Sequence, residues 1–201
     1  MGFISTTPLT ELEAVNSLLS AIGEAAVSSL ETATTVEVTQ AKNLLSNVNR
    51  ETQQKGWHFN TEWDVTLTRD SDNKIPIGSS VLSVYVENQL TTIRGISGVM
   101  YIYDLDNNTF TWTSNLTNAV TITLLDFQDT PQAVRQYVTT KAARIFQEEI
   151  IGQVSAEKVN RQEEAEAYAD LLDDEAERAG FNVGYGTLDM INMTKTHRKF
   201  W

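Results

Sequence analysis

The sequence contains no cysteine among its 201 residues, which excludes a disulfide framework and thiolate chemistry. It has only two histidines, His58 and His197, and three prolines. No apolar run approaches the roughly 18–20 residues that a transmembrane helix requires. The N-terminal Met1–Ser5 also lacks the basic and long apolar regions of a signal peptide. These absences favour a protein that folds in a reducing compartment and has no membrane partner.

Basic residues are also scarce, since 15 Lys and Arg stand against 27 Asp and Glu and give a net charge of −12. Binding to nucleic acid through phosphate neutralisation needs clustered Lys and Arg, so we expect no such binding. An acidic surface beside DNA would instead repel the backbone and let it slide. The simpler alternative is that the charge only keeps the protein soluble. The apolar content of 41% is typical of a globular chain with its own core.

The first 56 residues carry two copies of one helix pattern. A capping box opens each copy, apolar side chains then recur every three or four residues, and a glycine ends it. The capping pairs are Thr10 with Glu13 and Thr34 with Glu37; the apolar stripes are Leu12, Val15, Leu19 and Ile22, then Val38, Ala41, Leu45 and Val48; the glycines are Gly23 and Gly56. We therefore predict an N-terminal helical hairpin over residues 1–56.

From Trp57 the apolar period changes to two, which predicts a strand with one buried face. The alternating residues are Trp57, Phe59, Trp63, Val65 and Leu67. Further strands are predicted at Val81–Val86, Leu90–Arg94, Val99–Tyr103, Thr109–Thr113 and Ala119–Leu125, with Asp104–Asn108 as a hairpin loop. We predict one antiparallel sheet, inserted between helices over residues 57–128.

Residues 129–180 return to helix. Thr130 has the place of a cap and Pro131 that of the first helical residue, where its missing N–H costs nothing. The buried stripe of this helix is Val134, Val138, Ala142, Ile145 and Phe146, with an end near Gly152. A polar helix then runs from Ser155 to about Ala179, and between Glu157 and Arg178 it carries nine acidic against three basic residues. These two helices are predicted to complete a bundle with the first two.

Residues 181–201 have no apolar period and are interpreted as an extended arm. Its end combines positive charge with aromatic rings, which suits docking on an acidic surface. The candidate partner-binding residues are Lys195, Arg198, Lys199, Phe200 and Trp201. The alternative is a loose chain end. Trp63, Trp112 and Tyr103 are likewise either sheet core or interface anchors.

A polysaccharide hydrolase is the alternative function, and without cysteine it would depend on paired carboxylates. Glu163 with Glu166, or Asp170 with Asp174, would lie at a suitable distance on one helix face. Because any acidic helix meets that condition, we expect no catalytic site. Asp104, Asp106 and Asn108 have calcium-loop spacing, but Thr109 replaces the required glycine, so we expect a turn and neither a metal nor a cofactor.

Two blocks of residues resemble the tail tubular protein A family. The first comprises Ala14–Asn16, Ser20–Glu24, Val27–Glu31, Asn49-Arg50 and Gly56–Asn60; the second comprises Asp126-Phe127, Pro131, Arg135, Thr140–Arg144, Phe146, Gly152 and Glu163-Glu164. Members of this family are the head-to-tail adaptor, or gatekeeper, subunits of short-tailed phages of the podovirus type. The blocks cover roughly half of the chain, in the family's order and spacing.

The resemblance implies a structural virion protein with no catalytic site. It implies a dodecameric ring between the portal protein and the nozzle of tail tubular protein B, at the head-to-tail interface, assembled in the host cytoplasm. Such a ring extends the DNA channel used in DNA ejection and supports the tail fibres, without binding DNA specifically. The fold prediction is α+β: a helical bundle of two N-terminal and two C-terminal helices, an inserted antiparallel sheet and a C-terminal arm.

Overall fold

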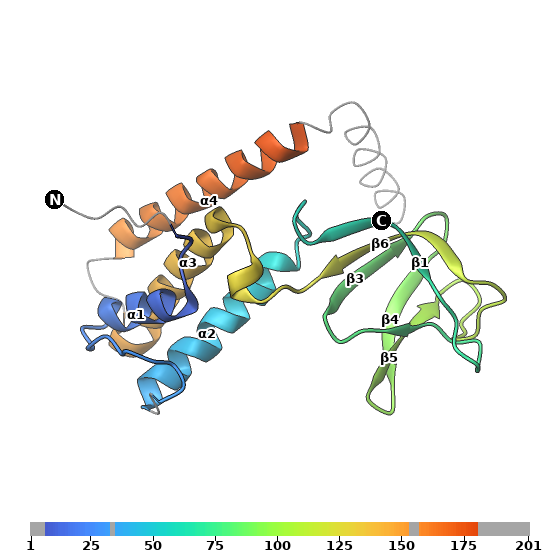
Figure 1. Ribbon diagram of the computed structural model, residues 1–201, viewed down its shortest axis with the longest axis horizontal. Coiled ribbons are helices and arrows are strands. Elements are labelled where there is room, and N and C mark those ends of the chain that lie inside the picture. Colours follow the sequence, from blue (N-terminus) through green and yellow to red (C-terminus); the bar gives the residue numbers. More distant parts are fainter. Residues whose placement is uncertain (1–6, 33–34, 153–156, 181–201) are drawn as a thin grey trace. The chain divides into compact units, whose positions relative to one another are not determined.

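The computed structural model describes residues 7–32, 35–152 and 157–180, and it confirms the α+β fold (Figure 1). The helices are α1 (Glu11–Ala21), α2 (Val36–Gln53), α3 (Gln132–Ile151) and α4 (Glu157–Gly180), with a short 3-10 helix at Phe127–Asp129. The strands are β1 (Thr61–Leu67), β2 (Pro76–Ile77), β3 (Val81–Val86), β4 (Thr91–Ile96), β5 (Val99–Asp104) and β6 (Leu116–Thr123). No described helix is both long and apolar enough to cross a bilayer.

The chain forms two compact units. The helical unit comprises Met1–Leu45 with Pro131–Trp201, and the β unit comprises Ser46–Thr130. The division falls inside α2, whereas the sequence placed its first boundary at residue 56. The segments 1–56, 57–128, 129–180 and 181–201 stay a proposed domain division.

Helix α1 begins with the capping box that the sequence predicted. The Thr10 hydroxyl accepts a hydrogen bond from the Glu13 N–H at 3.2 Å, and the Glu13 carboxylate accepts one from the Thr10 N–H at 2.8 Å. These bonds satisfy backbone donors that a helix start otherwise leaves free. The backbone bond from Thr10 is the main reason why the pKa of Glu13 is lowered. The described contacts pair α1 with α3 more extensively than with α2, so α1 packs mainly in a helical layer with α3 and α4.

The apolar stripe of α3 is the centre of the helical unit. Val134, Val138, Ala142 and Phe146 are buried, as predicted, whereas the fifth predicted member, Ile145, is only half-buried. The helix ends at Gly152, whose φ is 82°. The predicted cap was wrong. Thr130 donates its hydroxyl hydrogen to the carbonyl of Phe127 at 2.8 Å and thereby closes the 3-10 turn, while Pro131 occupies the N-cap position without a side-chain cap.

Helix α2 keeps its predicted stripe, since Val38, Ala41, Leu45 and Val48 are buried. The predicted cap Thr34 lies outside the described residues, and its neighbour Thr35 accepts a hydrogen bond from the Val38 N–H at 3.4 Å. Gly56, which follows the helix, has a φ of 75°, and a Cβ on it would approach the side chain of Ile122 to 2.7 Å. The backbone angle therefore favours glycine at this position, and a Cβ there would also require the end of the Ile122 side chain to shift.

A network of buried amides fixes the end of α2 within the β unit. The Gln53 side chain accepts a hydrogen bond from the Leu125 N–H and donates to the Leu125 carbonyl and to Asn49, each at 2.8–2.9 Å. Asn60 donates to the carbonyls of Gln53 and Thr123, both at 3.0 Å. Gln53 is fully buried, so its two amide ends have exchanged water for these partners.

The sheet prediction was wrong in number, because the β unit contains two three-stranded antiparallel sheets. Their strand orders are β1-β6-β3 and β2-β5-β4. Both sheets contribute to one core, with Val86 and Ala119 from the first and Ile102 and Ile77 from the second. Ile75 and Trp112 fill the same core from segments outside the longer strands. Because the two small sheets bury their apolar residues in one core, the strands of one sheet need not be hydrogen-bonded to those of the other.

Several strands also differ from the prediction, among them β4, which ends at Ile96, and β6, which spans Leu116–Thr123. Residues 57–60 form a turn, because Asn60 accepts a hydrogen bond from the Trp57 N–H at 2.8 Å, so β1 begins only at Thr61. The segment 109–113 makes isolated bridges and no strand, and the two-residue β2 was not predicted. In β1 the pairing shifts between Glu62 and Val65, where Asp64 has a φ of 56°. This bulge breaks the alternation and leaves Trp63 51% exposed.

Candidate assembly surfaces

Helix α4 is attached to α3 along a narrow seam. Ala167 and Leu171 are its buried residues, and the ring of Tyr168 lies 5.1 Å from that of Tyr137 on α3. The side chains of residues 161–178 are described, and most of their surface is exposed.

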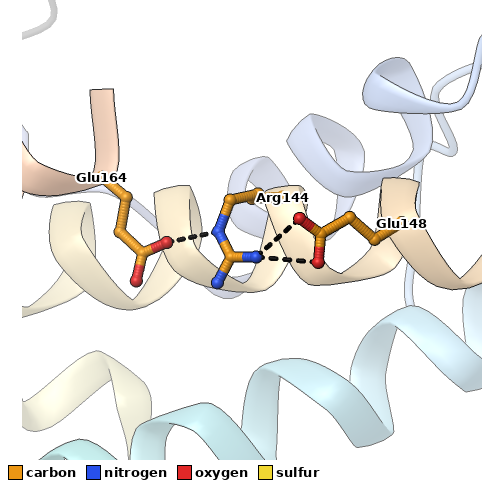
Figure 2. A network of polar contacts seen from close by, with 3 residues as sticks. All are labelled: Arg144, Glu148 and Glu164. Carbon is orange, nitrogen blue, oxygen red and sulfur yellow. Dashed lines mark hydrogen bonds and ion pairs between the residues drawn. The ribbon is translucent and has the colours of Figure 1, made fainter. Parts of the chain in front are cut away.

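An ion-pair network closes the edge of this seam (Figure 2). The Arg144 guanidinium on α3 donates to Glu164 on α4, and it donates to both carboxylate oxygens of Glu148 at 2.8 Å. Burial alone would lower the pKa of Arg144, but the hydrogen bonds and charges of Glu164 and Glu148 outweigh burial and raise that pKa. Arg144 therefore stays charged and joins the two helices through Glu164.

The exposed side of α4 is divided into two parallel strips. Each strip follows the spacing of four, three and four residues that keeps side chains on one helix face. The acidic strip consists of Glu166, Asp170, Asp173 and Glu177, and the apolar strip consists of Ala165, Ala169, Leu172 and Ala176. Leu172 is 44% exposed, whereas its neighbour Leu171 is 1% exposed. The helix thus has an amphipathic face in addition to the one that packs on α3.

The second candidate surface is the outer face of the β4–β5 hairpin. Ile102 points into the core, so the alternate residues Val99, Tyr101 and Tyr103 of β5 point to the other side. The Arg94 guanidinium carbon lies 3.8 Å from the Tyr103 ring centroid, and the Lys74 ammonium lies 5.8 Å from that of Tyr101. We call this surface, made of Lys74, Arg94, Val99 and Tyr101 together with the buried Tyr103 ring that Arg94 covers, the hairpin face.

The hairpin is held rigidly at both ends. Ser97 and Gly98 form the two-residue turn at its tip, and both have positive φ. Positive φ at both positions gives such a turn the twist of the strands that it joins. At its other end the Asp104 carboxylate accepts hydrogen bonds from the N–H groups of Asp106 and Asn107 and from the Asn107 amide. Burial by itself would raise the pKa of Asp104, but these hydrogen bonds outweigh it and the pKa is lowered.

The hydrolase candidates do not lie in a cleft. Glu163, Glu166 and Asp170 are exposed, and Asp174 accepts from Arg178 at 3.0 Å. A catalytic carboxylic acid needs a site that holds its proton, and this surface is open to water. His58 is exposed, and His197 lies outside the described residues.

The remaining site predictions have mixed outcomes. The segment Asp104–Asn108 forms a turn, but an isolated bridge between Asp104 and Thr109 closes it, and no second strand follows as the hairpin prediction required. In the described part of the chain there is no group of three or more metal-ligating side chains. Of the three aromatic residues, Trp112 and Tyr103 are buried, whereas Trp63 is exposed. Lys195, Arg198, Lys199, Phe200 and Trp201 lie outside the described residues, so their role stays a prediction.

Comparison with protein families decides the class of the chain. The model of the tail tubular protein family matches residues 12–181, which include all four helices up to Gly180 and both sheets. The chain belongs to the tail tubular protein family. It is a structural protein of the phage tail, and the virion tail is its location. A search of curated proteins matched none.

Sequence reasoning missed the hairpin face of this tail tubular protein. Its residues are spread over residues 74–103, and no single short motif contains them. The available signal was the register, since a two-residue turn at Ser97-Gly98 places Arg94 opposite Tyr101. The two exposed strips of α4 were also missed, because a count of charges does not show how the side chains are distributed around the helix.

Proposed function

We propose that this tail tubular protein is the A-type, head-to-tail adaptor subunit of a short-tailed phage. The observation that carries the proposal is the family match over residues 12–181, together with the A-type residue blocks in the same stretch. Twelve copies would form a ring between the portal protein and the nozzle of tail tubular protein B. The ring would continue the DNA channel and give the tail fibres part of their attachment site.

The architecture supports this role in two respects. The α1–α3–α4 layer and the shared core of the two sheets give each unit a fixed shape, as a ring subunit requires. Exposed apolar residues on both units, among them Leu172, Val99 and Trp63, offer contacts for neighbouring subunits. Ring closure would be heterologous, because each subunit presents one surface to the next copy and a different surface to the previous copy.

The acidic charge suits a channel through which DNA moves without being held. A net charge of −12 repels phosphate, so we expect no specific DNA binding. In this proposal the C-terminal residues Lys195, Arg198, Lys199, Phe200 and Trp201 reach an adjoining ring or neighbouring subunit. Removal of 195–201 should leave a folded subunit that attaches poorly, and normal tail assembly by the shortened chain would contradict that role.

Electron microscopy of the chain mixed with purified portal rings of the same phage tests the proposal. The expected result is an added ring with twelve subunits on one face of the portal. The chain alone and the portal alone are the controls, and the first of them shows whether the portal is needed for ring closure. Bare portal rings beside a monomeric chain would overturn the adaptor role.

A further inference from the structure

The hairpin face carries a positive charge that the described part of its own chain does not neutralise. Arg94 is exposed and stacks on Tyr103, and no described carboxylate lies within ion-pair distance of it. Lys74 has only a loose pair with the exposed Asp72, at 3.7 Å. In a chain with a net charge of −12, such a cation on a rigid aromatic support is a feature that a partner's carboxylates would complement.

An apolar side chain accompanies this charge. Val99 lies on the same side of the hairpin as Tyr101, is 46% exposed, and is paired with Ile96 at the turn. Because Arg94 and Ile96 are two residues apart on β4, the charged and the apolar part of the hairpin face are separated by about 7 Å. A partner must therefore present carboxylates and small apolar groups side by side at that spacing.

The exposed strips of α4 have this chemistry. Each acid of the acidic strip directly follows a residue of the apolar strip, so the two strips are neighbours on one helix. On a helix roughly 10 Å wide, neighbouring strips lie about 7–10 Å apart. Leu172 offers an apolar contact for Val99, and Asp170 and Asp173 offer carboxylates for Arg94.

We propose that the exposed strips of α4 dock on the hairpin face of a second copy of the chain. This inference rests on the proposed ring, in which two different surfaces of one chain meet between neighbouring copies. The contact is heterologous, so it can repeat around a closed ring. The Arg94 guanidinium, which lies over the Tyr103 ring, loses little conformational freedom when it pairs with carboxylates of the neighbour.

A photo-crosslinking experiment on the assembled full-length chain tests where the hairpin face docks. Val99 is replaced by a benzoylphenylalanine residue, and heavy-isotope and light copies are mixed before assembly on portal rings. The expected products join position 99 of one copy to peptides within 161–178 of the other, in heavy–light pairs. Products that join position 99 to other segments, or that occur only within single copies, overturn the inference.

A second experiment exchanges the charges of the two surfaces. Arg94→Glu alone and the pair Asp170→Arg with Asp173→Arg should each weaken ring formation about tenfold or more, and their combination should restore most of it. Matched controls are Arg50→Glu and the pair Glu24→Lys with Glu31→Lys, which change exposed charges elsewhere and should have little effect. Circular dichroism shows whether each variant is folded.

The outcomes separate the two proposals. Normal rings from the Arg94→Glu variant, or no recovery in the combined variant, overturn the α4 contact and leave the adaptor role standing. An unmodified chain that forms no ring on portals overturns the adaptor role, and this inference with it.

Discussion

The helical unit and the β unit are stabilised by different kinds of side chain. In the helical unit, apolar stripes make the helix contacts, and the polar link between Arg144 and Glu164 lies at a partly exposed edge. The β unit contains an apolar core and, in addition, a network of buried amides in which Gln53 is fully buried. A polar group at an exposed edge can return to water when its partner is lost, and a buried amide cannot. The same kind of polar substitution should therefore cost more in the β unit.

The largest effect is expected from an apolar truncation in the helical unit. Phe146→Ala should lower the free energy of unfolding by about 3–5 kcal/mol, because it leaves a cavity under α3. Ile150→Ala, on the same helix and 46% exposed, is the control and should cost far less. Urea unfolding measures both changes. Similar losses of unfolding free energy in the two variants would show that the buried stripe of α3 does not stabilise the helical unit more than its exposed side does.

A polar substitution in the β unit should come next. Gln53→Leu keeps much of the side-chain volume but removes the hydrogen bonds that Gln53 makes with the Leu125 backbone and with the Asn49 side chain. We expect the free energy of unfolding to fall by about 2–3 kcal/mol. Gln54→Leu changes an exposed neighbour in the same way and should be nearly neutral. The difference between the two midpoints of urea unfolding is the measured quantity. A neutral Gln53→Leu variant would contradict the role assigned to the amide network.

The polar link of the helical unit should matter less. Arg144→Met should cost about 1–2 kcal/mol, since Glu164 and Glu148 lose their partner but retain partial access to water. Arg178→Met removes an exposed pair with Asp174 and should have almost no effect. Amide hydrogen exchange of α4 is the more sensitive readout, because a loosened seam should speed exchange there first. If Arg144→Met lowered the free energy of unfolding as much as Gln53→Leu does, polar side chains would not differ in importance between the two units.

The smallest effect concerns pH. Asp104 has a pKa below its ordinary value of 3.8, so it contributes stability above that value, and this contribution is lost as the pH falls through its lower folded pKa. Asp104→Asn should therefore destabilise by less than about 1 kcal/mol at pH 7, and the deficit should shrink toward pH 3. Unfolding by urea at the two pH values measures it, with Glu87→Gln as an exposed control. A deficit that grows as the pH falls would contradict the assignment.

The helical unit was predictable from sequence because its information is local. Each predicted feature lies within a few turns of one helix. The structure confirms the capping box of Thr10 and Glu13 and the buried stripe that runs from Val134 to Phe146. The acidic α4 and the stop at Gly152 follow from composition and spacing in the same way. What the pattern did not show was the choice of partner, since helix stripes do not specify which helix they meet.

The β unit was less predictable because its structure depends on residues far apart in sequence. The Asn60 amide joins residues 53 and 123, and the turn it stabilises replaces the predicted start of β1. The bulge at Asp64 interrupts the strand pairing beside the exposed Trp63, and period-two alternation carries no sign of it. The hairpin face likewise exists only through strand pairing. Assembly surfaces built in this way need a structure before they can be named.

Cryo-electron microscopy of the intact virion tail tests the central claim most directly. The account predicts a ring between portal and nozzle with twelve copies of density that fits the helical unit and the β unit, and with α4 of one copy against the hairpin face of the next. A tail whose density at that position fits neither unit would contradict the adaptor role.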